Sequence, residues 1–101
     1  MSFVVTRKDL PEGSILVITD KEVLGKVFVE GKKQLDLSKP FYHGEEKTIE
    51  KIKEEIKSTY ILHLSGENSV SLGVELGLVD NNRIIWIQNV PHAEVVLEKW
   101  S

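Results

Sequence analysis

Hydrophobic residues recur at helical spacing in the middle of the chain. They are three or four positions apart, and charged residues of both signs lie between them. This period predicts a helix over residues 48–64, with the charged side chains facing water. The predicted apolar face consists of Ile49, Ile52, Ile56, Tyr60 and Leu64. Because such a face must be covered, we expect the helix to pack on a sheet formed by the flanking segments.

Strand patterns fill the first part of the chain. Residues 2–7 and 14–19 are rich in β-branched and apolar side chains, and a Pro-Glu-Gly turn separates them, so they should form a hairpin. Asp20 is then expected to cap a short helical turn over residues 21–24. Alternating polarity predicts a strand at 26–30, and a short edge strand should follow at 34–37.

The second part of the chain contains one ambiguous segment. In residues 69–76 the apolar positions alternate as in a strand, but flanking polar residues and Gly77 are typical of a helix. The pattern alone favours neither structure. Residues 83–88 and 94–98 predict two further strands, joined by a turn at 89–92.

Composition narrows the class of protein. The chain has 101 residues and no cysteine, so we expect a single domain over 1–101 without disulfides or Cys-based metal sites. No apolar run approaches the roughly 18 residues of a membrane span, and the start lacks the basic region of a signal peptide, so a cytoplasmic location is expected. Net charge is −3, yet residues 1–57 hold 11 basic and 11 acidic side chains. Any contact with nucleic acid should therefore involve the first half.

One segment of that half combines positive charge with aromatic rings. Four lysines lie near the loop that contains Phe41, and together they offer charges for phosphates and rings for unpaired bases. The alternative is that the lysines protect a sheet edge while the rings anchor the loop. The candidate RNA-binding residues are Lys26, Lys32, Lys33, Lys39, Tyr42 and His43, with His92 from a later turn.

Catalytic and cofactor motifs are absent from the sequence. No glycine-rich phosphate loop occurs, Ser65 lies in no G-x-S-x-G elbow, and the histidines lack the spacing of a zincin. We therefore expect neither a cofactor nor a metal, and the chain is more typical of a non-enzymatic protein. A small histidine-dependent enzyme remains an alternative, and it requires His43 and His92 to share one pocket with a carboxylate. His63 is expected near the end of the long helix.

A set of short motifs resembles the archaeal family called domain of unknown function 424. The resemblance covers nearly the whole chain, and it implies that residues 69–76 are helical. It also implies an archaeal cytoplasmic protein that binds RNA and works near the translation machinery. The chain departs from the family pattern at His63 and Glu94, where the pattern has side-chain amides. The motifs are Leu24-Gly25-Lys26, Pro40-Phe41-Tyr42-His43-Gly44, Leu64-Ser65-Gly66, Leu76-Gly77-Leu78-Val79 and Val90-Pro91-His92-Ala93.

These observations together predict an α+β fold. An antiparallel sheet, made of an N-terminal meander and a C-terminal strand pair, should pack against one long and one shorter helix. The leading functional hypothesis is a non-enzymatic RNA-binding or translation-associated module, with RNA or the ribosome as partner and no membrane contact. The second is a protein-interaction module or homodimer that pairs through a sheet edge, near Gln34 or at residues 95–100.

Overall fold

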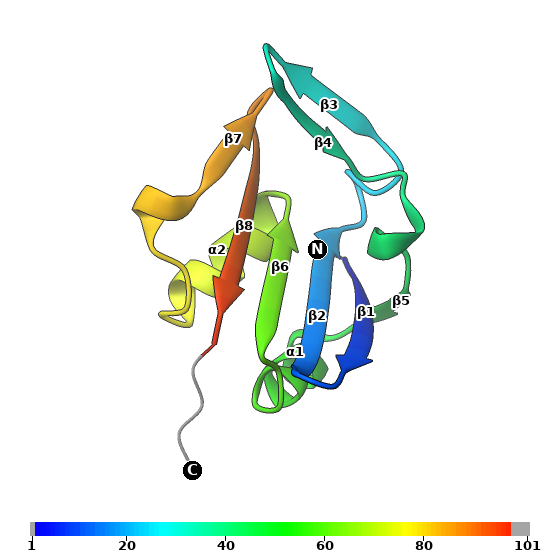
Figure 1. Cartoon of the computed structure of the whole chain (residues 1–101), viewed down its shortest axis with the longest axis vertical. Coiled ribbons are helices and arrows are strands. Elements are labelled where there is room, and N and C mark those ends of the chain that lie inside the picture. Colours follow the sequence, from blue (N-terminus) through cyan, green and yellow to red (C-terminus); the bar gives the residue numbers. More distant parts are fainter. Residues whose placement is uncertain (1, 98–101) are drawn as a thin grey trace.

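A six-stranded sheet forms the centre of the computed structural model of the protein, which describes residues 2–97. Its strands are β1 (Phe3–Leu10), β2 (Gly13–Asp20), β5 (Glu45–Lys47), β6 (Ile61–Ser65), β7 (Ile85–Ile87) and β8 (Val90–Val96). They lie side by side in the order β5-β1-β2-β6-β8-β7 (Figure 1). Two further strands, β3 (Val27–Glu30) and β4 (Lys33–Asp36), form a separate hairpin at the top of that view.

The sheet is mostly antiparallel, as predicted, with one exception. The predicted N-terminal hairpin forms from β1 and β2, and the predicted C-terminal pair forms from β7 and β8. In contrast, β2 and β6 run parallel, with Val17 beside His63. The sheet does not continue as a meander after β2, because β3 and β4 leave it and pair with each other. A long connection containing this hairpin and a helix then returns the chain to β6, as a parallel pair requires.

The prediction of a helix over residues 48–64 is wrong for the second half of that range. The helix α1 spans only Ile49–Ile56, and Thr48 caps it by accepting a hydrogen bond from the Lys51 amide at 3.2 Å. Residues 61–65 instead form β6 at the centre of the sheet. A step of four positions equals two strand repeats as well as about one helical turn, so the spacing of Tyr60 and Leu64 fits both structures.

Two acidic residues before α1 lie in an edge strand of the sheet. Glu45 and Glu46 belong to β5, where they pair with Val5 and Val4 of β1. The first helical residue is Ile49, so only Glu50 places a carboxylate in the first turn.

Both helices cover one face of the sheet and lie behind it in Figure 1. The second helix, α2 (Glu67–Glu75), confirms the helix implied for residues 69–76. Apolar side chains of β1, β2, β6 and β8 meet the helices in the main core, and Ile52 of α1 is completely buried there. Among the described residues, no helix is long and apolar enough to cross a membrane.

The opposite face of the sheet carries the hairpin of β3 and β4 and a short 3-10 helix, η1 (Pro40–Tyr42). A smaller core holds the hairpin in place. Leu35 and Leu37 pack against Ile87 of β7, and Phe28, Tyr42, Val23 and Val90 surround them. Side chains of β6 and β8 that point to this face therefore lie beneath or beside the hairpin.

The turn predicted at residues 89–92 begins one residue earlier and is shorter. Gln88 and Asn89 both have positive φ, 48° and 65°, and they form a two-residue loop between Ile87 and Val90. Residues 90–92 consequently belong to β8. His92 is thus a buried strand residue rather than a displayed turn residue.

Candidate functional site

A cleft of about 570 Å³ lies between the hairpin and the last two strands of the sheet. The hairpin strand β4 and the following loop form one wall, and β7 and β8 form the other. Charged, aromatic and aliphatic side chains all contribute to its surface. Its lining comprises Lys33, Gln34, Leu35, Asp36, Lys39, Tyr42, Ile85, Ile87, His92 and Glu94.

The cleft contains four of the seven candidate RNA-binding residues, namely Lys33, Lys39, Tyr42 and His92. They come from the hairpin, the loop after it, η1 and β8, so the fold brings together residues far apart in sequence. The other three candidates, Lys26, Lys32 and His43, are exposed and do not line the cleft.

The charged side chains of the hairpin and of the loop after it are only partly paired with opposite charges within the protein. The Lys33 ammonium donates a hydrogen bond to the Trp86 carbonyl at 3.1 Å and lies 3.8 Å from a Glu30 carboxylate oxygen. Lys39 forms no ion pair within residues 2–97. Asp36 accepts hydrogen bonds from the hydroxyl and the amide of Ser38, which lower the pKa of its carboxyl.

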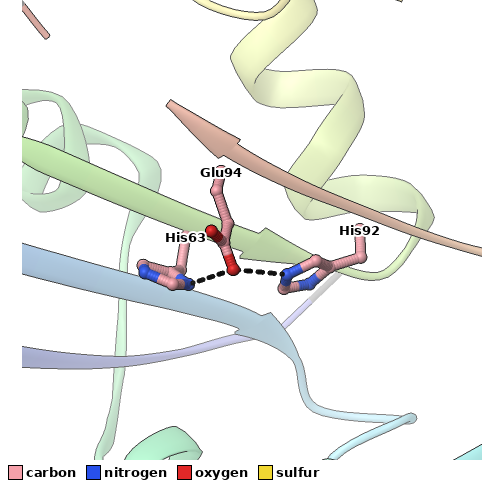
Figure 2. A group of neighbouring side chains, drawn as sticks. All are labelled: His63, His92 and Glu94. Atoms are coloured by element: carbon pink, nitrogen blue, oxygen red, sulfur yellow. Dashed lines mark hydrogen bonds and ion pairs between the residues drawn. The ribbon is translucent and has the colours of Figure 1, made fainter. Parts of the chain in front are cut away.

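Two histidines and a carboxylate converge beside the cleft, which His92 and Glu94 line. His63 lies on β6, directly opposite Glu94 of β8, and His92 lies two residues before Glu94 on the same face. His63 Nδ1 and His92 Nε2 are each 3.4 Å from the same oxygen, Oε1 of Glu94. Dashed lines in Figure 2 mark these two contacts. All three potential ligand atoms lie within 4.8 Å of one another.

A buried serine fixes the orientation of His92. The Ser65 hydroxyl lies 2.8 Å from His92 Nδ1, which leaves Nε2 directed toward Glu94. Ser65, His92 and Glu94 thus follow one another like a catalytic triad. However, Ser65 is only 1% exposed and does not line the cleft, so its hydroxyl cannot attack a substrate there. The serine holds the imidazole, and it is not a nucleophile.

His63 is held by aromatic packing rather than by a hydrogen bond through Nδ1. The Phe41 ring meets the imidazole edge-on, with centroids 5.1 Å apart, and Lys8 lies over the Phe41 ring at 4.9 Å. The buried Nδ1 atom makes no hydrogen bond within the described structure. Burial lowers the pKa of His63, and the nearby Glu94 carboxylate opposes that shift. The ring therefore favours its neutral form.

The structure does not pair the two histidines that the enzymatic alternative requires. His43 is exposed, its Nε2 lies 3.1 Å from the Ser38 carbonyl, and it is not among the cleft residues. His92 meets His63 instead, at a distance of 6.2 Å between ring centroids. The placement of His63 near a helix end was wrong because residues 61–65 form a strand.

Sequence reasoning did not select His63 and Glu94 as site residues. Alternation along each strand and the pairing register bring them together, and the register is not visible before the strands are identified. The resemblance gave one signal, since it implied a family pattern with side-chain amides at these two positions. The structure makes them cross-strand partners.

The sheet edges considered for a homodimer differ in their surroundings. Gln34 lies in β4, and its side chain lines the cleft. At the other candidate edge, β7 pairs with residues 90–92 of β8, and Val96 is 57% exposed. Residues 98–100, which completed the predicted last strand and edge, lie outside the described part of the chain.

Comparison with known proteins supports the fold and the family. The crystal structure of an uncharacterized conserved protein from Methanopyrus kandleri is similar, with a TM-score of 0.77. It is 21% identical, and the match covers 100% of this chain and 98% of that one, so the likeness concerns the fold alone. No curated protein matches the sequence. The family model described as "Protein of unknown function (DUF424)" matches residues 9–97, and the chain therefore belongs to this family, as the resemblance predicted.

Proposed function

We propose that this protein is a non-enzymatic module that binds single-stranded RNA in the cleft beside the hairpin. The observation that carries the proposal is the meeting of Lys33, Lys39, Tyr42 and His92 around one cavity. The two lysines supply positive charge for phosphates, and the ring side chains supply surfaces and polar atoms for an unpaired base.

The size of the cleft favours a single strand over a duplex. Its volume of about 570 Å³ is within the range of roughly 300–1,000 Å³ that is usual for sites of small ligands. Such a cavity accommodates a nucleotide or a short unpaired segment, whereas a double helix needs an extended surface. We therefore expect an RNA loop or end to enter the cleft with its backbone along the rim.

Fluorescence anisotropy with a labelled single-stranded oligoribonucleotide tests the proposal. We expect binding at low salt, and Lys33→Glu combined with Lys39→Glu should weaken it at least about tenfold for every RNA sequence. The matched control reverses two exposed lysines of α1, Lys51→Glu and Lys53→Glu, so that net charge is the same in both variants.

Either of two results would overturn the proposal. One is the absence of binding at low salt, and the other is an equal loss of affinity in the α1 control. If the cleft variants alone lose affinity, recovery of the tagged protein from an archaeal lysate with and without ribonuclease would test the link to translation. Ribosomal or transfer RNA recovered only without ribonuclease is the expected result.

A further inference from the structure

We infer that His63, His92 and Glu94 bind one divalent transition-metal ion of the zinc class beside the cleft. The three side chains come from two adjacent strands and point to one spot on the same face of the sheet (Figure 2). This site shares His92 with the proposed RNA-binding residues, and it adds an inorganic ligand for which the sequence has no spaced motif.

The separations of the donor atoms fit such an ion. Tetrahedral zinc with ligand bonds of about 2.0–2.1 Å places its ligands about 3.3–3.4 Å from one another. Two of the three separations, from each histidine nitrogen to Glu94 Oε1, are 3.4 Å. The third lies within 4.8 Å, so the two histidine nitrogens need to approach each other by up to about 1.4 Å to bind the ion.

Hydrogen bonding alone leaves this arrangement incomplete. His92 Nε2 forms a hydrogen bond of 3.4 Å with Glu94 Oε1, whereas His63 Nδ1, at 3.4 Å from the same oxygen, is buried and makes no hydrogen bond within residues 2–97. A buried polar atom without a partner is uncommon and calls for a specific reason. A cation between the three atoms satisfies both nitrogen lone pairs and the carboxylate charge together.

The surroundings of His92 match those of a metal ligand. Histidines that bind metals usually donate the other ring N–H to a neighbouring oxygen, which fixes the tautomer and the ring orientation. The Ser65 hydroxyl, 2.8 Å from Nδ1, provides that oxygen and leaves the Nε2 lone pair for the ion. On the other side, packing against Phe41 fixes the ring of His63.

The ligand set also indicates which ions fit and how open the site is. Two imidazoles and one carboxylate suit zinc and its first-row neighbours, whereas magnesium and calcium prefer oxygen ligands alone. The histidine side chains are 16% and 10% exposed, while Glu94 is 61% exposed. Since His92 and Glu94 line the cleft, the fourth coordination position faces the cavity and remains accessible to water or another ligand.

Isothermal titration calorimetry, in which Zn²⁺ is added to the tag-free full chain, tests the inference. We expect one ion per chain. Replacing a ligand, by His63→Ala or Glu94→Gln, should weaken binding by more than about 100-fold, and Ser65→Ala should weaken it by about 10–100-fold, as losses beside metal ligands do. The matched control is His43→Ala, which removes an exposed histidine outside the cluster.

A second readout separates metal binding from effects on folding. Co²⁺ bound to a tetrahedral site absorbs visible light, so the parent chain should develop this spectrum and Glu94→Gln should not. Glu94 is largely exposed, and its isosteric replacement leaves the core intact. No stoichiometric binding by the parent, unchanged affinity in Glu94→Gln, or an equal loss in His43→Ala would each overturn the inference.

Discussion

The carboxylate of Asp20 accepts two hydrogen bonds from Ser69, one from the backbone amide at 2.8 Å and one from the hydroxyl at 2.6 Å. Its other oxygen accepts from the Asn68 amide at 2.9 Å. Asp20 was predicted to cap a turn over residues 21–24, but its side chain caps α2 instead. The end of β2 is thereby joined to the start of α2, the helix that follows Ser65 of β6.

Replacing Asp20 with Ala should lower the free energy of unfolding by about 2–4 kcal/mol, because a charged acceptor is lost and buried donors remain without partners. Urea unfolding followed by circular dichroism measures this. Asp80→Ala is a suitable comparison, since the Asp80 carboxylate accepts one exposed hydrogen bond, from the Asn82 amide at 2.9 Å. Its effect should be below about 1 kcal/mol. Equal losses in the two variants would contradict the long-range cap.

The lowered pKa of the Asp9 carboxyl leads us to expect that its local contribution to stability depends on pH. A hydrogen bond from Ser14 and then interactions with Arg7 lower its pKa below 3.8. The pKa of Asp9 is lower in the folded state than in the unfolded state. The carboxylate therefore contributes its full stabilisation above pH 3.8, and this contribution is lost as the pH falls through the pKa of the folded state. Ser14→Ala should raise the pKa of Asp9 toward 3.8, which carboxyl-carbon NMR titration measures. The pKa of Asp36, lowered by Ser38, is the internal reference and should not move.

The sequence predicts an element of the fold correctly where its residue pattern fits only one kind of secondary structure. A run of β-branched and apolar residues on each side of a proline-glycine turn has one meaning, and the predicted hairpin of β1 and β2 forms, with β1 ending at Leu10 instead of residue 7. Residues 60–64 were assigned to a helix because their spacing fits both periods. The choice is made by tertiary pairing, since Leu62 and Leu64 fill the core between β2 and β8.

The candidate site was predictable only in part for a related reason. Charge and aromatic content in residues 26–43 selected Lys33, Lys39 and Tyr42, which the structure places at one cleft. The cluster of His63, His92 and Glu94 depends on the register of two antiparallel strands. A shift of one residue would turn His63 to the other face, and neither strand alone contains the metal-ligand spacing.

Ile52 tests the packing of α1 on the sheet. Its side chain is completely buried in the main core, so Ile52→Ala should lower the free energy of unfolding by about 2–5 kcal/mol. The neighbouring Lys53→Ala, at an exposed position of the same helix, should change it by less than about 0.5 kcal/mol. Chemical denaturation measures both. A loss of only a few tenths for Ile52→Ala would contradict helix-on-sheet packing.

The salt dependence of RNA binding counts the phosphate contacts that the cleft makes. Each contact with a single strand contributes about −0.7 to the slope of log Kobs against log salt concentration, so one contact each from Lys33 and Lys39 gives about −1.4. Removing the Lys39 ammonium in Lys39→Ala should reduce the slope by about 0.7, because one fewer counterion is released. Lys53→Ala on α1 should leave the slope unchanged. Anisotropy titrations over a range of salt concentrations measure these values. A slope near zero would show that phosphates are not bound, and an equal change in both variants would place the RNA outside the cleft.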